Sequence, residues 1–393
     1  MDFVRACRRN AIEPILFLSK PDEQPSWVMD DYYAEGVAIQ QVNGYDADEL
    51  LEACKRLAQQ AELVAVLSLY EYSTAHAAQA ASSLGLRSPD PDVVRRVRDK
   101  AQFRRFVFER QLDDTRFLAI DARSSGEVVW PHDYPVVVKP VNLTGSAFVR
   151  HCRNEAELQT ALREIGCLSE YTGQAVDSTV LIEEYIGGSE FSVEVLNGSV
   201  IGIVRKYTTD HPGFIEVGHD VPSDIGPDVE QSIKQSVQQF LTEVGYRFGL
   251  MHIELKHNES GVHFIEANPR VAGGRIPELI RLTQGVDMIE AYLLSLAGGE
   301  SAVQPRSSGE YASIRFLVAE EEGVFEGYRE VDPAEHPLIT EHKFYKTVGD
   351  AFQINHSNRD RIVHAVAVSD SIERNESAID AFFDAMQIRE VVR

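Results

Sequence analysis

LMHIELKHNESGVHFIEANPR, residues 250–270, carries the strongest structural signal in this chain. The segments on either side of HNESG alternate apolar and polar residues, and Asn, Ser and Gly between them favour a turn, so a β-hairpin is predicted. Side chains share a face of a strand every two residues, so an even register places Glu254 opposite the pair Glu266 and Asn268. Carboxylate and amide oxygens gathered in this way favour Mg²⁺ ions that carry phosphates.

Arg270 lies two residues beyond Asn268 and can balance phosphate charge that the metal ions leave exposed. The alternative is a solvated hairpin whose acidic side chains face water. That alternative is adequate for Glu254 taken alone. It does not account for the set of four residues, so the hairpin is predicted to carry a metal and phosphate site.

The composition predicts a globular protein of two or three domains. The chain has 393 residues, which is too long for one ordinary core, and 44% of them are hydrophobic. A formal net charge of −24 argues against nucleic acid or an anionic membrane as the main partner. Four scattered cysteines indicate a reduced, cytoplasmic protein, and no apolar run approaches the roughly 20 residues that span a bilayer.

Residues 1–90 alternate helix and strand patterns, which predicts an α/β domain with a parallel sheet. Within this domain, Asp46–Gln60 is expected to be a helix that opens with a capping box of Asp46 and Glu49. Leu63–Leu67 is expected to be a further strand.

Residues 91–300 are predicted to form the central domain. They begin with a basic helix over Asp92–Arg110, and Asn197-Gly198 between two apolar runs predicts a hairpin. Ile233–Gly245 is expected to be a helix with one apolar face. After a linker that contains Ser, Gly and Pro, strand patterns dominate residues 301–393.

Two lysines and a small loop are candidates for phosphate binding, which needs cations and exposed backbone N–H groups. Lys139 ends the apolar strand VVVKP and is harder to explain as a solvated side chain than Lys100 in RDKAQFRRF. In the loop Asn142–Ser146, the glycine permits close backbone approach and Ser146 adds a hydroxyl donor. An ordinary hairpin turn is the alternative for this loop.

Taken together, Glu254, Glu266, Asn268 and Arg270 resemble the metal-binding signature of the ATP-grasp superfamily. The continuation VAGGRIPELI is most similar to the ATP-grasp ligases that join L-amino acids into dipeptides. Biotin carboxylases and carbamoyl-phosphate synthetases resemble the ENPR part and diverge immediately after it. The resemblance implies an ATP-grasp fold of mixed α/β (α+β) class, with a Rossmann-like N-terminal domain, a central domain that closes over ATP, and a β-rich C-terminal lobe.

The same resemblance implies how ATP is recognised by LIEEYIGGSEFSVEV. Glu183 is expected to face the adenine amino group, Tyr185 and Ile186 to offer main-chain groups to the ring, and Glu190 to accept hydrogen bonds from the ribose hydroxyls. Charged residues on an ordinary edge strand are the alternative.

By the same resemblance, Lys100 and Lys139 contact the nucleotide phosphates. Two Mg²⁺ ions, for which Mn²⁺ is a substitute, would lie between those phosphates and the metal ligands Glu254, Glu266 and Asn268. Lys206 on the preceding hairpin is expected to add another charge toward the phosphates.

The acceptor side is predicted from the residues that follow Arg270. Gly273 and Gly274 lead into Arg275-Ile276-Pro277, where the proline suits the first turn of a helix whose N-terminus attracts anions. The resemblance implies that Arg275 lies near an acyl phosphate. It also implies that Glu216 and His219 of FIEVGHDVPS wall the substrate cavity, with a purely structural role as the alternative for His219.

The implied reaction is ATP-dependent amide formation between a small-molecule carboxylate and an amine, either two L-amino acids or an amino acid and another carboxylate. Arg270 and Arg275 would act by positioning and charge neutralisation, so no side-chain nucleophile is required. The oligomeric state is left open, with a homodimer as one alternative. Rival functions are a biotin-carboxylase or carbamoyl-phosphate type of enzyme, a ligase for other carboxylates, and a non-catalytic ATP-binding regulator.

Overall fold

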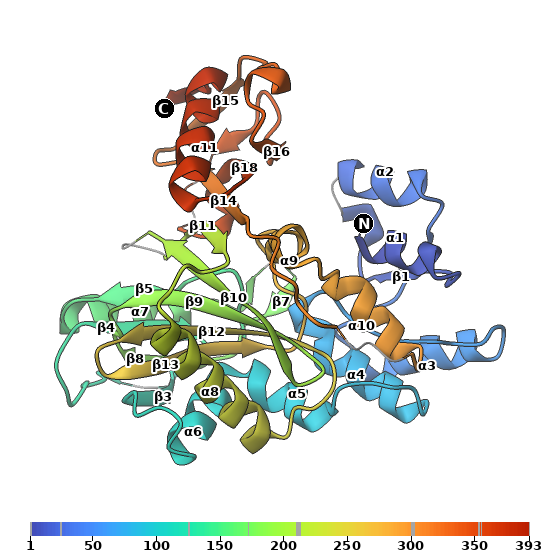
Figure 1. Ribbon diagram of the computed structural model, residues 1–393. Coiled ribbons are helices and arrows are strands. Elements are labelled where there is room, and N and C mark those ends of the chain that lie inside the picture. The colour runs from blue at the N-terminus through green and yellow to red at the C-terminus, as the bar shows by residue number, and fades with distance from the viewer. Residues whose placement is uncertain are drawn as a thin grey trace.

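The computed structural model describes residues 2–23, 26–124, 126–171, 173–209, 214–299, 303–352, 354 and 356–392. Its strands form an eight-stranded sheet, a four-stranded sheet and smaller sheets of two and three strands. In Figure 1 the C-terminal part stands at one end of the molecule and the N-terminal helices lie to one side of the central sheets. The predicted mixed α/β class is confirmed.

The N-terminal part packs helices around a parallel pair of strands. β1 (Ile15–Leu18) pairs with β2 (Ala38–Gln41), and the helices are α1 (Asp2–Arg9), α2 (Ser26–Ala34), α3 (Ala47–Ala58) and α4 (Thr74–Ser83), with the 3₁₀ turns η1 (Pro21–Glu23) and η2 (Glu71–Ser73). Asp46 caps α3 as predicted, because its side chain accepts from the N–H groups of Asp48 and Glu49. Glu49 does not complete the predicted capping box, since its carboxylate accepts from the N–H of Asn43.

The strand predicted over Leu63–Leu67 is wrong. The segment is extended but joins no described sheet. Leu63 and Val66 pack with the α3 residues Leu50 and Ala53, whereas Ala65 and Leu67 pack against a different core cluster, which contains Leu279 and Leu293. Apolar contacts on both sides explain why its sequence has the pattern of a buried strand.

The single helix predicted over Asp92–Arg110 is also wrong, because it divides at Asp99 into α5 (Pro91–Arg98) and α6 (Lys100–Glu109). Asp99 has an extended backbone (φ −75°, ψ 113°), and its side chain accepts from the N–H of Gln102. An aspartate that caps a new helix satisfies a donor that a continuous helix would have satisfied internally. The break makes Lys100 the first residue of α6.

The four-stranded sheet has the order β3-β8-β4-β5 and is antiparallel throughout. Its strands are β3 (Phe117–Asp121), β4 (Val136–Pro140), β5 (Arg150–Cys152) and β8 (Thr179–Glu184), and α7 (Glu155–Gly166) packs on it. A short hairpin of β6 (Glu170–Tyr171) and β7 (Gln174–Ala175) lies between α7 and β8 in the sequence.

The eight-stranded sheet has the order β13-β12-β9-β10-β11-β14-β18-β16, and each of its pairs is antiparallel. Its strands are β9 (Ser189–Leu196), β10 (Ser199–Thr208), β11 (Glu216–Val221), β12 (Leu250–Asn258), β13 (Gly261–Asn268), β14 (Tyr311–Val318), β16 (Ile339–Phe344) and β18 (Arg361–Ser369). Both predicted hairpins are confirmed, and Glu254 lies directly opposite Glu266 in the register.

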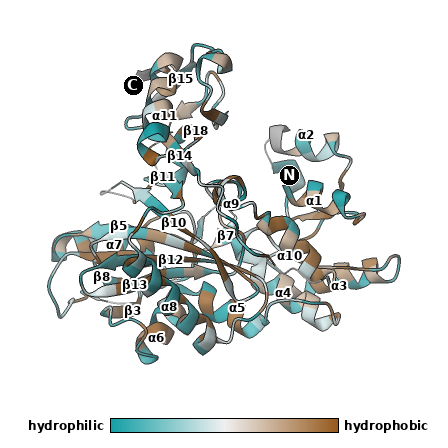
Figure 2. Cartoon of the chain, in the orientation of Figure 1, coloured by the Kyte–Doolittle hydropathy of each residue, from teal (hydrophilic) through white to brown (hydrophobic). Residues whose placement is uncertain are grey.

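Three helices lie between strands of this sheet in the sequence: α8 (Pro227–Val244) between β11 and β12, and α9 (Ile276–Gln284) and α10 (Met288–Leu296) between β13 and β14. The predicted apolar face of α8 is confirmed, since Ile233, Val237 and Phe240 are fully buried in one cluster with Phe264 of β13. In Figure 2, apolar residues also lie along β12 and α10. No helix among the described residues combines the length and apolarity needed to cross a membrane.

The C-terminal part continues the large sheet, because β14 pairs with β11. The remaining elements are β15 (Gly323–Gly327), β17 (Ala351–Phe352) and β19 (Arg389–Val392) in a three-stranded sheet, the helix α11 (Ile372–Met386), and the 3₁₀ turns η3 (Pro333–Glu335) and η4 (Asn358–Asp360). The boundary predicted near residue 300 therefore falls between strands of one hydrogen-bonded sheet.

Gly188, at the start of β9, is expected to be intolerant of a side chain. Its φ is +113°, and a Cβ there would lie 2.4 Å from the carbonyl oxygen of His257 on β12. Gly188→Ala should lower the free energy of unfolding by more than about 1–2 kcal/mol, the cost of the backbone conformation alone. Gly187→Ala is the matched control, because a Cβ there meets no atom within 4 Å. Urea unfolding checks the difference, and equal stability of the two variants would contradict it.

Candidate functional site

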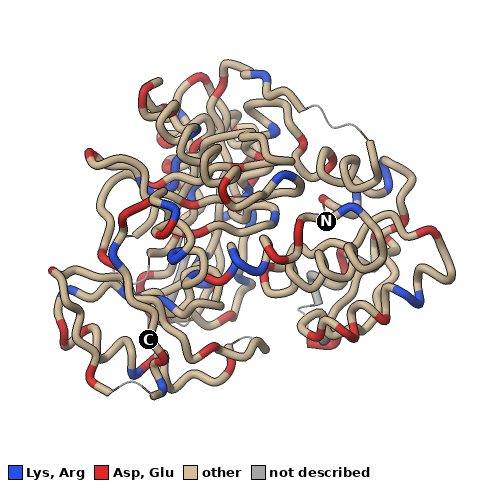
Figure 3. The backbone as a smooth tube through the Cα atoms, turned by 90° about the horizontal axis from the view of Figure 1, so that it is seen from below, with Lys and Arg blue, Asp and Glu red and all other residues tan. Residues whose placement is uncertain are grey.

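A cavity of about 310 Å³ lies between the two sheets, within the range of small-molecule sites. Seven Lys or Arg residues and six Glu residues stand on its described wall: Lys100, Arg104, Lys139, Lys206, Lys256, Arg270, Arg361, Glu183, Glu184, Glu190, Glu216, Glu254 and Glu266. Acidic residues are spread along the whole chain (Figure 3), whose net charge is −24. The cavity therefore differs from the rest of the molecule, because cations offset its carboxylates.

One side of the cavity carries the two candidate phosphate-binding lysines. Lys100 Nζ lies 2.8 Å from the carbonyl oxygen of Leu143 and 3.1 Å from Glu266 Oε2. Burial alone would lower the pKa of Lys100, but the charges of Glu266 and Glu71 raise it above its usual value. Lys139 Nζ pairs with Glu183 and donates to the carbonyl oxygen of Ile265. Both side chains are thus buried and paired with carboxylates.

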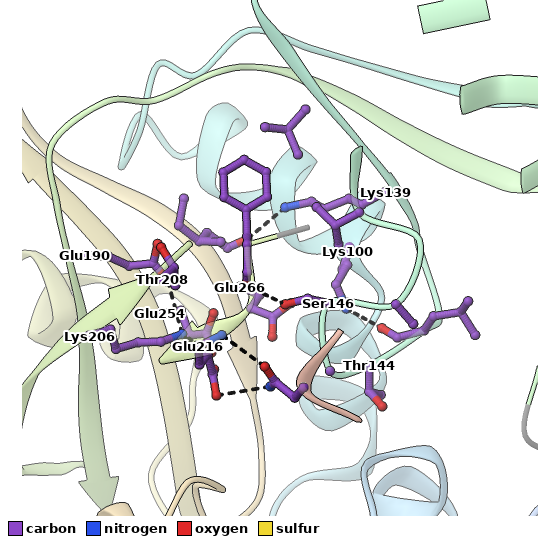
Figure 4. Close-up of a pocket in the computed structure, with 18 of the residues that line it drawn as sticks. Lys100, Lys139, Thr144, Ser146, Glu190, Lys206, Thr208, Glu216, Glu254 and Glu266 are labelled. Atoms are coloured by element: carbon purple, nitrogen blue, oxygen red, sulfur yellow. Dashed lines mark hydrogen bonds and ion pairs between the residues drawn. The ribbon is translucent and has the colours of Figure 1, made fainter. Parts of the chain in front are cut away.

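The predicted small loop lies beside these lysines. Leu143, Thr144, Gly145 and Ser146 all line the cavity, and Gly145 and Ser146 have φ values of 64° and 58°. The hydroxyl of Ser146 donates to the carbonyl oxygen of Phe214 at 3.2 Å. Figure 4 shows Thr144 and Ser146 on the same side as Lys100 and Lys139.

The residues expected to recognise adenosine form another part of the wall. Lys256 donates to the carbonyl oxygen of Ile186 at 3.1 Å and lies 5.0 Å from the centre of the Tyr185 ring. The ring of Phe214 stacks near Tyr185 at an interplanar angle of 21°. An aromatic pair beside main-chain and carboxylate groups is suited to a flat heterocycle with polar edges.

The two metal-ligand candidates Glu254 and Glu266 face each other across β12 and β13 and both line the cavity. Burial would raise the pKa of Glu254, but Lys206 and His252 lower it below its usual value. Burial would also raise the pKa of Glu266, but the charge of Lys100 lowers it. Both carboxylates are therefore ionised. The third candidate, Asn268, is 2% exposed and is not on the described cavity wall, but its amide nitrogen donates to Glu266 Oε1 at 2.7 Å.

Lys206, which was expected to add a positive charge toward the phosphates, pairs with three carboxylates of the cavity. Its Nζ lies 3.1 Å from Glu190, 3.1 Å from Glu216 and 2.8 Å from Glu254. From the sequence, Glu190 was assigned to the ribose, Glu216 to the substrate and Glu254 to the metal ions. Lys206 therefore contacts one candidate residue for each of these three ligands. Figure 4 shows these four residues together.

Arg270 lines the cavity and is held by a residue that the sequence pattern did not reveal. Its Nε and Nη2 donate to Glu71 Oε2 at 3.1 and 2.6 Å, and its Nη1 donates to the carbonyl oxygen of Val271. Glu71 lies in η2 of the N-terminal part and is 5% exposed. No spacing connects residues 71 and 270, so only the packed fold brings them together.

Besides Asn268, two predicted site residues, Arg275 and His219, lie off the described cavity wall. Arg275 is in the left-handed conformation (φ 62°) at the N-cap of α9, and its side chain pairs with Glu341 and with Asp2. His219 is fully buried beneath Gly274, where a Cβ would lie 2.5 Å from its Nε2. Burial lowers the pKa of His219 to about 3, so the ring is neutral. Glu216, Gly273 and Gly274 line the cavity, whereas Arg275 and His219 are not among its described lining residues.

Arg104, also missed from the sequence, supports the phosphate side. It is 1% exposed and pairs with Glu183, with Asp113 at 2.7 Å and with the carbonyl oxygen of Phe264. Burial would raise the pKa of Glu183, but Arg104 and Lys139 lower it. Arg104 thus keeps Glu183 ionised, and its place in a helix of mixed charge gave no signal.

Arg104→Met should destabilise the fold by about 3–5 kcal/mol, because it leaves two buried carboxylates without a shared cation. Arg105→Met is the matched control, since the adjacent arginine is exposed. Chemical denaturation at neutral pH measures both. If Arg104→Met lowers the free energy of unfolding no more than the control does, this ion-pair network contributes little to stability.

Comparison with known proteins relates most of the sequence around the cavity to one domain family. Residues 132–278 match the model of the ATP-grasp domain. An uncharacterized protein of Sinorhizobium fredii is 26% identical over 380 residues, covering 94% of this chain and 76% of its own length. A D-alanine–D-alanine ligase of Pediococcus pentosaceus is 26% identical over 181 residues, covering 43% of this chain and 48%, or about half, of its own.

The fold is similar to that of a solved L-amino acid ligase from Bacillus licheniformis. The TM-score is 0.80 at 17% sequence identity, with 98% of this chain and 95% of the other covered. At this identity the likeness concerns the fold.

Proposed function

We propose, for this member of the ATP-grasp superfamily, that it is an ATP-dependent carboxylate–amine ligase that forms an amide bond through an acyl phosphate. The observation that carries the proposal is the pair of ionised, opposed carboxylates Glu254 and Glu266 on the wall of a cavity that also holds buried lysines. Such a wall suits metal ions that bring a polyanion to a second substrate.

The donor set fits Mg²⁺. Glu254 and Glu266 offer hard, ionised oxygens, and the amide oxygen of Asn268 belongs to the same chemistry. When bound, the ions would supply positive charge that neutralises the charge developing during phosphoryl transfer. Lys100, Lys139 and Arg270 would supply the remaining positive charge.

The reaction has two displacement steps. An oxygen of the carboxylate substrate attacks the γ-phosphorus, the bond to the bridging oxygen breaks, and ADP leaves. The amine then attacks the acyl carbon and loses a proton, while phosphate leaves with the original carboxylate oxygen. The cavity residues would align the reactants and neutralise charge, a role that needs no side-chain nucleophile.

The substrates we infer are L-amino acids, or an amino acid and another carboxylate. The matched D-alanine–D-alanine ligase and the structurally similar L-amino acid ligase support this class. The sites we assign by chemistry are Glu183, Tyr185, Ile186 and Glu190 for adenosine, Ser146 with the two lysines for phosphates, and Glu216, Gly273 and Gly274 for substrate. The four cysteines are free thiols, which supports a reducing, cytoplasmic location.

Two rivals remain distinct in their chemistry. An enzyme of the biotin-carboxylase or carbamoyl-phosphate type would phosphorylate bicarbonate and need no amino acid. A regulator that binds ATP without catalysis would release no ADP.

Glu266→Gln should abolish Mg²⁺-dependent ADP release while the fold stays intact, because the carboxylate serves the metal rather than the core. Glu259→Gln, in the exposed turn of the same hairpin, is the control and should keep full activity. Calorimetric titration of Mn²⁺ in the presence of ADP gives a second readout. Turnover and Mn²⁺ affinity near those of the unaltered chain would remove the metal assignment.

Oxygen-18 placed in the carboxylate substrate should appear in the released phosphate, since the acyl phosphate transfers that oxygen. The measurement uses paired L-amino acids, mass spectrometry of the phosphate and detection of the amide product. Bicarbonate-dependent ADP release without an amino acid would instead favour the carboxylase rival. No ADP release with any carboxylate would favour the regulator.

A further inference from the structure

We propose that Arg361, in the C-terminal lobe, binds a substrate carboxylate that takes no part in the reaction. One of the two substrates must then carry such a group in addition to the reacting one. The inference rests on the proposed function, because it assigns a specificity element to the same cavity.

Arg361 reaches the cavity from a rigid position. It is the first residue of β18 and follows η4, whose start is fixed by a capping box between Ser357 and Asp360. Asn358 of η4 also lines the cavity. Among the described lining residues, these two are the contribution of residues 301–393, so the C-terminal lobe acts on the cavity through them.

The guanidinium of Arg361 is fixed from two sides. Its Nε and Nη2 donate to the carbonyl oxygen of Glu216 at 3.1 and 2.8 Å, and Nη2 also lies 2.9 Å from Glu216 Oε2. Its Cζ lies 3.7 Å from the centre of the Phe316 ring. Asn358 holds the same glutamate through a bond of 3.1 Å to Oε2 and accepts from its N–H at 3.0 Å. A guanidinium that is already ordered loses little entropy when a ligand binds.

One donor edge of this guanidinium is not used by the protein. Nη1 forms no hydrogen bond to another described residue, although the side chain is only 10% exposed. Nη1 carries two N–H groups, and charge-assisted hydrogen bonds from a guanidinium to a carboxylate oxygen are among the strong ones. A ligand oxygen in the cavity would supply the missing acceptor.

The surrounding charges favour a carboxylate over a phosphate at this position. Glu216 lies between Arg361 and Lys206, with Oε2 toward the former and Oε1 3.1 Å from the Nζ of the latter. The doubly charged phosphate would be repelled by Glu216 more strongly than a single carboxylate charge. Figure 4 shows Glu216 across the cavity from Lys100 and Lys139, which are the phosphate candidates.

The neighbouring Glu216 and Arg361 also offer opposite charges to one ligand. An ammonium group could approach the glutamate while a carboxylate approaches the arginine, which fits a zwitterionic amino acid. The carboxylate could come from an amino-acid amine or from the second carboxylate of a diacid donor. The chemistry at Arg361 is the same for both sources.

The test compares probes that differ by one charge. L-amino acids are paired with their C-terminal amides as amines, and succinate and glutarate with their monomethyl esters as donors. The unaltered chain should prefer the free carboxylate in one of the two series by on the order of 10- to 100-fold in kcat/KM. Arg361→Gln should bring that ratio close to one and leave the KM for ATP unchanged. The series that responds identifies the source.

Arg359→Gln is the matched control, because this arginine lies on the same turn but packs 5.2 Å from the ring of Tyr171 and is not on the described wall. It should keep the preference. Arg361→Lys, which keeps the charge but not the planar fork, should give an intermediate ratio, and thermal unfolding shows whether each variant is folded. A preference that survives in folded Arg361→Gln overturns the inference and leaves the proposed function intact.

Loss of the proposed function has a different signature, namely no amide product from any pair with the unaltered chain. The inference is then decided by thermal stabilisation with the same probes in the presence of MgADP. Stabilisation by free carboxylates but not by their amides or esters, lost in Arg361→Gln, supports it. No carboxylate-dependent stabilisation across the whole panel overturns it.

Discussion

The buried ammonium group of Lys206 holds three partly buried carboxylates, Glu190, Glu216 and Glu254, within 3.1 Å. Burial would lower its pKa, but the three negative charges raise it well above the usual value. Without this cation, the carboxylates on β9, β11 and β12 would lie close together in a region of low dielectric with no shared positive partner. Because Lys206 lies on the strand between β9 and β11, the order of the sheet places it where the charges converge.

Other ion pairs extend this balance to distant parts of the chain. Arg270 reaches Glu71 in the N-terminal part, and Arg361 reaches Glu216 from the C-terminal lobe. The nearly equal numbers of cations and carboxylates on the wall have a consequence for the proposed function. Mg²⁺ and ATP enter as a metal with a polyanion, so their arrival would change the net charge of the cavity less than either would alone.

Local patterns predicted the hairpins well, because strand alternation and turn residues act over a few residues. Alternation with a period of two was enough to place Glu254 opposite Glu266. The failures have equally physical causes. Leu63–Leu67 is apolar because two clusters contact it, not because it joins a sheet, and Asp99 divides a basic helical pattern by capping a second helix.

The sequence was sufficient for the ATP-grasp fold and for the hairpin that places Glu254 opposite Glu266, since these follow from contiguous motifs. It also indicated most of the candidate residues that the structure gathers around the cavity. The partners of these residues depend on long-range packing. Glu71 lies 199 residues from Arg270, Arg361 lies 145 residues from Glu216, and Arg104 lies 79 residues from Glu183. Charge pairing in a buried cavity is set by distances in space, to which spacing along the chain gives no guide. For the same reason Arg275 and His219, adjacent to the site in sequence, are not among the described residues of the cavity wall: Arg275 pairs with Glu341 and Asp2, and His219 is buried beneath Gly274.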